Sequence, residues 1–213
     1  MNMPRIIGIY LAAGQSRRMG MDKRSLPFSG NTLGDAALKA AVLSLLSHVL
    51  VVVPPDDTLT WLAPELAKHK KCTIIRCFDC SRGQAHSLRC GIKRAMQMQA
   101  EAIVILLADQ PFITEAVINE LIQLYEQYQA DYISFTNNGI VMPPVLFARS
   151  TFFDLLLLDG DEGARKLLRN QSRWKGITQE STTEKIFFDI DTKEDYLHAI
   201  KQSEKKEGFD GYR

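Results

Sequence analysis

The sequence lacks an excess of charge of either sign, because 26 Lys and Arg residues stand against 25 Asp and Glu residues. Proteins that bind duplex nucleic acid usually carry a strong basic excess, so nucleic acid is not an expected partner. The chain also has no apolar run long enough to cross a membrane, and its first residues lack the sections of a signal peptide. We therefore expect a cytoplasmic protein that binds neither nucleic acid nor a membrane.

Cysteine is scarce, with four residues in 213. Cys72, Cys77, Cys80 and Cys90 formally have the spacing of a plant-type iron–sulfur pattern. However, the segment 72–77 is typical of a β-strand, which spreads its residues instead of wrapping a cluster. A structural zinc site would usually show two closely spaced pairs. We expect reduced, partly buried thiols, and the pattern assigns them no role.

Two common phosphate-binding motifs are missing from the loop that follows the first apolar segment. A Walker A motif needs Lys directly after its second Gly, whereas Met21 follows Gly20 here. The dinucleotide fingerprint Gly-x-Gly-x-x-Gly is absent as well. The loop still combines small residues such as Gly14, which let backbone N–H groups approach a phosphate, with the cations Arg18 and Lys23. This combination favours a nucleoside-triphosphate site, and a basic strand-to-helix turn without a ligand is the simpler alternative.

Segments typical of strands and helices alternate along the chain. Strands are expected at 5–11, 49–53, 73–77, 102–107, 131–135, 145–148 and 185–188, and helices at 32–47, 59–68, 84–99, 114–129, 151–158, 163–170 and 193–201. This alternation predicts an α/β fold whose mostly parallel sheet is covered on both faces and binds ligands beyond the carboxyl ends of its strands. The length fits one domain over 1–201, followed by a charged, flexible tail over 202–213.

Acidic residues follow two of the predicted strands. Asp109 comes directly after 102–107 and Asp191 follows 185–188, so both are expected at the ligand-binding edge. Carboxylate oxygens suit Mg²⁺, which also takes phosphate oxygens and water. A turn explains Asp109 equally well, and a helix cap formed by Thr192 and Asp195 explains part of the second segment. Beside a phosphate-binding loop, the two carboxylates indicate a shared metal ion.

A third polar loop, at 81–83, leads into the helix predicted at 84–99. The start of a helix presents free N–H groups and a dipole that favours anions. Ser87 and His86 are therefore candidates to contact a ribose or a base. For His86, we expect the simpler position of a residue on the helix surface.

Taken together, these motifs resemble the signature of the MobA-like nucleotidyltransferases. Residues 11–23 read Leu-Ala-Ala-Gly-x-Ser-x-Arg-Met-Gly-x-x-Lys, residues 108–111 resemble the family's metal-binding loop, and residues 189–192 resemble its late acidic motif. Ala12-Ala13 and the segment 158–165 are similar to the molybdenum-cofactor cytidylyltransferase branch, which implies CTP rather than GTP. The resemblance covers 5–200 and implies a three-layer αβα, Rossmann-like fold of the nucleotide-diphospho-sugar transferase type.

The resemblance implies a role for each matching residue. The expected catalytic residues are Arg18, Lys23 and Asp109; the ligands of Mg²⁺ or Mn²⁺ are Asp109 and Asp191; the nucleotide-binding residues are Leu11, Ala12, Ala13, Gly14, Ser16, Lys23, Gly83 and Ser87; and the acceptor-binding residues are Pro144, Gly160, Asp161 and Arg165. Pro143 stands where related sequences often have a polar residue. A glycine turn with a helix-capping aspartate would equally explain Gly160 and Asp161.

The reaction implied is transfer of CMP from CTP to molybdopterin, with release of pyrophosphate. The modified cofactor would serve a xanthine dehydrogenase-type molybdoenzyme of purine catabolism, whose apo form would be a transient partner. Because a phosphate nucleophile is already anionic at neutral pH, the site needs positioning and electrostatic stabilisation more than a strong general base. Two alternatives stay open. One is nucleotidyl transfer to a sugar phosphate or another small phosphate, and the other is a non-catalytic carrier that delivers the molybdenum cofactor.

Overall fold

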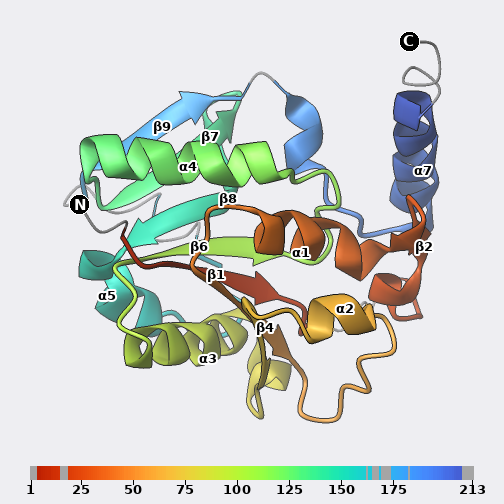
Figure 1. Ribbon diagram of the computed structural model, residues 1–213, viewed down its shortest axis with the longest axis horizontal. Helices are drawn as coiled ribbons and strands as arrows, with labels where there is room; N and C mark the ends of the chain where they lie inside the picture. Colours follow the sequence, from red (N-terminus) through yellow and green to blue (C-terminus); the bar gives the residue numbers. More distant parts are fainter. Residues whose placement is uncertain are drawn as a thin grey trace.

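The computed structural model describes residues 4–14, 19–161, 163–164, 168, 174–181 and 183–207 of the chain. Within these residues, seven strands form one sheet in the order β5-β4-β1-β6-β8-β7-β9 (Figure 1). The strands are β1 (Ile6–Leu11), β4 (His48–Val53), β5 (Cys72–Arg76), β6 (Ala102–Leu107), β7 (Tyr132–Asn137), β8 (Ile140–Ala148) and β9 (Gly176–Glu180). The first four strands in this order are parallel, and β8 runs antiparallel to both β6 and β7.

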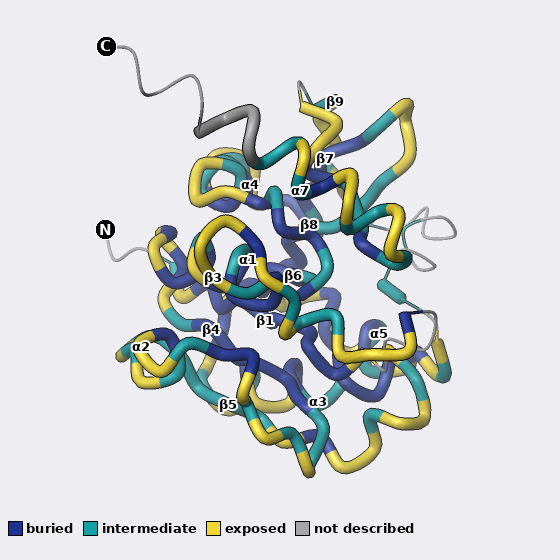
Figure 2. Tube along the Cα trace, turned by 90° about the vertical axis from the view of Figure 1, so that its right-hand side faces the viewer, coloured by how far each residue is buried: buried dark blue, intermediate teal, exposed yellow. Residues whose placement is uncertain are grey.

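Helices cover both faces of the sheet, which gives three layers (Figure 1). One face packs against α1 (Leu33–Leu43), α2 (Pro64–Ala67) and α4 (Glu115–Tyr128), and the other against α3 (Gln84–Gln97) and α5 (Phe152–Leu156). Strands β1 and β4 read as continuous apolar runs because both of their faces are buried (Figure 2). The predicted αβα fold with a mostly parallel sheet is therefore confirmed.

A smaller cluster lies at the edge of the molecule, where the short hairpin β2 (Pro27–Phe28) and β3 (Asn31–Thr32) meets α7 (Lys193–Glu207). The Tyr196 hydroxyl donates to the Pro27 carbonyl at 2.7 Å and joins the two elements. Helix α7 continues past residue 201, where the domain was expected to end, as far as Glu207. None of the helices in the described part of the chain is long and apolar enough to span a membrane.

Several predicted elements are wrong in type or extent. The segment 185–188 is not a strand, because η4 (Glu184–Phe187) is a 3₁₀ turn that buries Ile186 and Phe187. The last strand is instead β9, a largely exposed edge strand of mixed polarity. The helix expected at 59–68 shrinks to α2, because a residue before proline disfavours the helical conformation and Pro64 opens the helix. The helix expected at 163–170 falls largely outside the described residues.

The cysteines also differ from expectation. Cys77 follows β5 and Cys90 lies on α3, and the structure pairs them as a disulfide, with Cα atoms 6.1 Å apart. The expectation of reduced thiols is therefore wrong for this pair, because strand and helix bring residues thirteen apart into contact. Cys72 and Cys80 are free thiols, and burial raises the pKa of Cys72 to about 11.

Candidate active site

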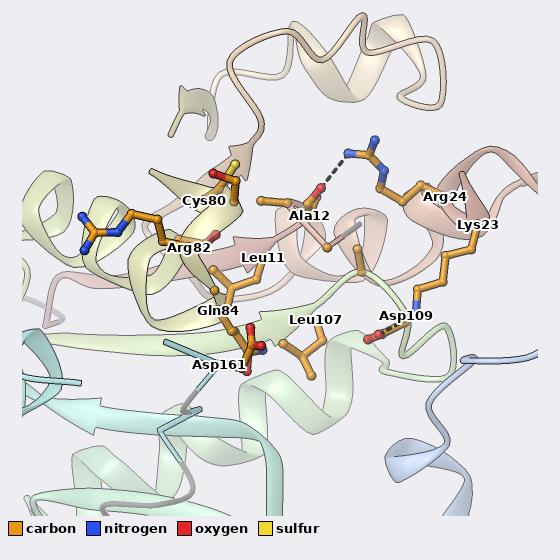
Figure 3. A pocket seen from close by; sticks show the side chains of 16 residues that line it. Leu11, Ala12, Lys23, Arg24, Cys80, Arg82, Gln84, Leu107, Asp109 and Asp161 are labelled. Atoms are coloured by element: carbon orange, nitrogen blue, oxygen red, sulfur yellow. Dashed lines mark hydrogen bonds and ion pairs between the residues drawn. The ribbon is translucent and has the colours of Figure 1, made fainter. Parts of the chain in front are cut away.

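A cavity of about 370 Å³ opens at the carboxyl ends of β1 and β6 (Figure 3). The two strands end in register, with Leu11 opposite Leu107, so the loops that follow them form adjacent walls. The cavity is lined by Leu11, Ala12, Ala13, Gly14, Lys23, Arg24, Cys80, Ser81, Arg82, Gly83, Gln84, Ser87, Leu107, Ala108, Asp109 and Asp161. This is the sheet edge at which ligands of such folds bind.

The segment 11–14 forms the wall that the sequence assigns to the nucleotide. The Ala12 N–H donates to the Val52 carbonyl at 2.9 Å, and the Ala108 N–H donates to the Leu11 carbonyl at 3.2 Å. These bonds continue the sheet pattern for one residue and hold the loop against the strands. Leu11, Ala12, Ala13 and Gly14 all line the cavity, whereas Ser16 and Arg18 lie outside the described residues.

Lys23 joins three segments at one end of the cavity. Its Nζ donates to Asp109 Oδ2 at 2.9 Å, to Asp191 Oδ1 at 3.2 Å and to the Ile190 carbonyl at 2.7 Å. Figure 3 shows the Lys23 side chain reaching down to Asp109. Burial favours the neutral amine, but the carboxylates of Asp109 and Asp191 outweigh it and raise the pKa of Lys23. The lysine is therefore a fixed positive charge.

The two carboxylates predicted to share a metal ion meet at this lysine. Their loops are also joined directly, because the Ile190 N–H donates to the Asp109 carbonyl at 3.0 Å. Asp195 Oδ2 accepts from the N–H groups of Asp191 and Thr192 at 3.1 and 2.8 Å, so the predicted helix cap holds the Asp191 backbone. The sequence thus brings the two carboxylates together from segments 82 residues apart.

The donor set fits a magnesium-like ion. Asp109 Oδ1 is buried and has no hydrogen-bond partner in the described structure, which is the state of an oxygen placed to bind a cation. Within the described residues, no group of three or more His, Cys, Asp or Glu side chains surrounds a common point. Two protein carboxylates are nevertheless what Mg²⁺ commonly takes, since phosphate oxygens and water complete its coordination.

Arg24 is a residue of this site that sequence reasoning missed. Its Nη1 donates to the Ala12 carbonyl at 2.6 Å and also to Asp57, while Nε and Nη2 both bind Asp22 at 2.8 Å. The guanidinium carbon lies 5.0 Å from the centre of the Trp61 ring. Arg24 therefore lines the cavity and holds the wall at Ala12 in place. No local signal identifies it, because the buried Asp57 comes from a loop 33 residues away.

The first turn of α3 forms the opposite wall. Gly83 has φ 124°, and a Cβ there would overlap the Gly160 carbonyl, so glycine is required on both counts. Gly83 and Ser87, which the sequence predicts to bind the nucleotide, line the cavity. The expectation that His86 lies on the surface is wrong: it is 4% exposed, and its Nε2 lies 3.0 Å from Asp159 Oδ1.

The residues predicted to bind the acceptor are only partly brought to the cavity. Asp161 lines it, and the Gly160 carbonyl accepts from the Ala85 N–H at 3.0 Å. Pro144 is buried in β8 after a cis bond to Pro143, at the bulge opposite Ser134 and Phe135, and does not line the cavity. Arg165 lies outside the described residues.

Comparison with known families agrees with this geometry. A family model described as the MobA-like NTP transferase domain matches residues 8–175. The chain belongs to the MobA-like NTP transferase family. The family membership predicted from the motifs is thereby confirmed, and the chain is a nucleotidyltransferase of the MobA-like type.

Individual relatives resemble the chain over different lengths. It is 40% identical to the purine catabolism protein PucB of Bacillus subtilis (strain 168) over 200 residues, 92% of this chain and 96% of PucB. It is 28% identical over 132 residues to a probable molybdenum cofactor guanylyltransferase of Mycobacterium avium (strain 104), 60% of this chain and 61% of that protein. Among solved structures, the Rv0371c homologue from Mycobacterium sp. strain JC1 superposes with a TM-score of 0.76 at 26% identity, covering 95% of this chain and 98% of the other.

Proposed function

We propose that this protein transfers CMP from CTP to the molybdenum cofactor and releases pyrophosphate. The observation that carries the proposal is the Lys23 ammonium, bound by Asp109 and Asp191 at the end of a cavity lined by the 11–14 backbone. One fixed cation and two carboxylates at one point suit a reaction between two polyanions. The names of the relatives support the acceptor, and Ala12-Ala13 supports CTP.

In the proposed reaction, a terminal phosphate oxygen of the acceptor attacks the α-phosphorus of CTP. A new P–O bond forms, the bond between the α-phosphorus and its bridging oxygen breaks, and the electron pair leaves with pyrophosphate. A Mg²⁺ or Mn²⁺ ion held by Asp109 and Asp191 would supply neutralisation of phosphate charge. Lys23 holds a positive charge beside the same phosphates, and the 11–14 backbone orients the base.

The same chemistry assigns a role to residues beyond the described part of the chain. Arg18 would stabilise the departing pyrophosphate, and Ser16 would bind the nucleotide phosphates. Arg165 would contact the acceptor together with Gly160 and Asp161. A cytoplasmic partner in this proposal is the apo form of a xanthine dehydrogenase-type molybdoenzyme, which would receive the modified cofactor.

The proposal is tested by pyrophosphate release with Mg²⁺, comparing CTP, GTP and ATP, with and without molybdenum cofactor. We expect release from CTP only when the cofactor is present. If pyrophosphate release requires a sugar phosphate instead of the cofactor, the reaction is still nucleotidyl transfer, but the acceptor is the sugar phosphate. Tight cofactor binding without release from any nucleotide would instead indicate a carrier that delivers the cofactor.

A further inference from the structure

A short loop, residues 158–161, is attached to the first two turns of α3 by contacts from consecutive residues. The Leu158 carbonyl accepts from Arg89 Nη2 at 2.6 Å, Asp159 Oδ1 lies 3.0 Å from His86 Nε2, and the Gly160 carbonyl accepts from the Ala85 N–H at 3.0 Å. Two of these three contacts are to the loop backbone. The His86 contact joins two side chains, and substitution of the exposed Asp159 removes it without disturbing a buried residue.

The loop also has no room to shift toward α3. A side chain at Gly83 would overlap the Gly160 carbonyl and come within 2.7 Å of the Asp161 nitrogen. The loop backbone therefore rests directly on the backbone that forms the cavity wall. Its last residue, Asp161, lines the cavity at the end away from Lys23 (Figure 3).

His86 and Asp159 differ in their exposure to solvent. His86 is buried within α3, whereas the Asp159 side chain is 76% exposed. The Gly160 N–H and the His86 ring lower the pKa of Asp159, so the carboxylate is anionic at neutral pH. Because the Asp159 side chain is exposed, we expect loss of this contact to change the position of the loop more than the global stability.

We propose that His86 is a positioning residue for the second substrate, acting through Asp159 to set the loop 158–161 and with it Asp161. This rests on the proposed function, because it assigns the acceptor to the Asp161 end of the cavity. A carboxylate such as that of Asp161 accepts hydrogen bonds, so it would bind an N–H or O–H group of the acceptor body and not its phosphate. The phosphate would remain at the Lys23 end.

The test uses variants that separate position from folding. Asp159→Ala removes the partner at an exposed site, His86→Ala removes the buried ring, and Asp159→Asn keeps a hydrogen-bonding group. Glu65→Ala, an exposed carboxylate on α2 that does not line the cavity, is the control. We expect KM for molybdenum cofactor to rise about 10-fold in both alanine variants, with KM for CTP and kcat within about twofold. Asp159→Asn and the control should match the unmodified protein.

Two results overturn the inference. One is an unchanged KM for the cofactor in Asp159→Ala. The other is an equal rise in KM for CTP, which would make the loop part of the nucleotide wall. In the double variant, Asp159→Ala with His86→Ala, KM for the cofactor should rise no further than in either single variant. Both substitutions remove the same interaction, so their effects should not add.

Failure of the proposed function would appear differently, as a lack of pyrophosphate release by the unmodified protein. In that case amide hydrogen exchange decides the inference without any substrate. Faster exchange at residues 158–161 in Asp159→Ala than in Glu65→Ala supports the positioning contact. Equal exchange in the two variants overturns it.

Discussion

At the scale of single residues, the site depends on where two neighbouring cations point. Lys23 binds the carboxylates of Asp109 and Asp191, while Arg24 turns the other way to the Ala12 carbonyl and Asp57. Two adjacent residues thus hold both the carboxylates at one end of the cavity and the wall at Ala12. The sequence motif identifies Lys23, but the role of Arg24 depends on a partner distant in the chain.

Lys23→Ala removes the fixed positive charge. We expect kcat for pyrophosphate release to fall about 10²–10³-fold, the usual loss for one preorganised electrostatic group. Lys39→Ala, which removes an exposed lysine on α1, is the matched control and should keep full activity. Near-normal turnover in Lys23→Ala with an unchanged circular dichroism spectrum would remove this assignment.

The pKa of Lys23 predicts the alkaline side of the pH profile. Because its carboxylate partners raise this pKa, the charge is present below the usual lysine value of about 10.4 and is lost only as the pH rises through the higher folded value. We expect kcat to stay level from about pH 7 to about pH 9. A fall within this interval that Lys23→Arg moves to higher pH would show that Lys23 titrates there.

At the scale of elements, helix termini and loops hold the chemistry in place. The cap at α7 holds the Asp191 backbone, and the start of α3 meets the loop 158–161 at Gly83. Helix α7 thus holds the Asp191 backbone beside the cavity, and the backbone at Gly83 holds the loop that carries Asp161. Substitutions there should affect activity more than surface changes of equal size.

Thr192→Ala deletes the hydroxyl that accepts from the Asp195 N–H at 3.1 Å and donates to its carboxylate at 2.8 Å. We expect the free energy of unfolding to fall by about 1 kcal/mol, as for other lost helix caps. We also expect a higher Mg²⁺ requirement for turnover, because Asp195 then holds Asp191 less firmly. Thr58→Ala, an exposed loop threonine, controls for general effects. An unchanged Mg²⁺ requirement would show that the helix cap does not affect binding of the metal ion.

Gly83→Ala introduces a side chain where α3 and the loop 158–161 touch. We expect kcat/KM to fall about 10-fold or more, because the loop must move away from the cavity wall. Gly30→Ala is an informative control, since Gly30 also has positive φ, 75°, but open space around it. It should lose about 1–2 kcal/mol of stability and keep its activity. Equal activity losses in both variants would indicate backbone strain and not contact with the loop.

The elements that could be predicted are those with a local signal. Residues 102–107 are apolar throughout and form β6 with the expected bounds. The spacing of Thr192 and Asp195 likewise predicts the helix cap that the structure shows. By contrast, β9 is an exposed edge strand with no apolar pattern, and His86 is buried by a loop 73 residues away. Contacts between residues that are distant in the chain cannot be predicted from the local pattern of a single sequence.

At the scale of the whole molecule, the fold gathers four segments at one sheet edge. They follow β1, β5, β6 and η4, and together with Asp161 of the loop 158–161 they place the cavity, the fixed cation and two carboxylates within one site. Parallel strands that end at one edge predict the convergence of the segments after β1, β5 and β6. Asp191 instead reaches the site after the 3₁₀ turn η4, where the sequence predicts a strand. Pro144 does not join the other predicted residues at this edge, because the bulge on β8 buries it away from the cavity.

The central claim, nucleotidyl transfer from CTP at this cavity, is tested most directly by following the phosphorus atoms. CTP labelled with ³²P at the α position, or separately at the γ position, is incubated with Mg²⁺, molybdenum cofactor and the protein. We expect the α label to enter the cofactor product and the γ label to leave as pyrophosphate. Transfer of the γ label to the cofactor, or no movement of either label, would contradict it.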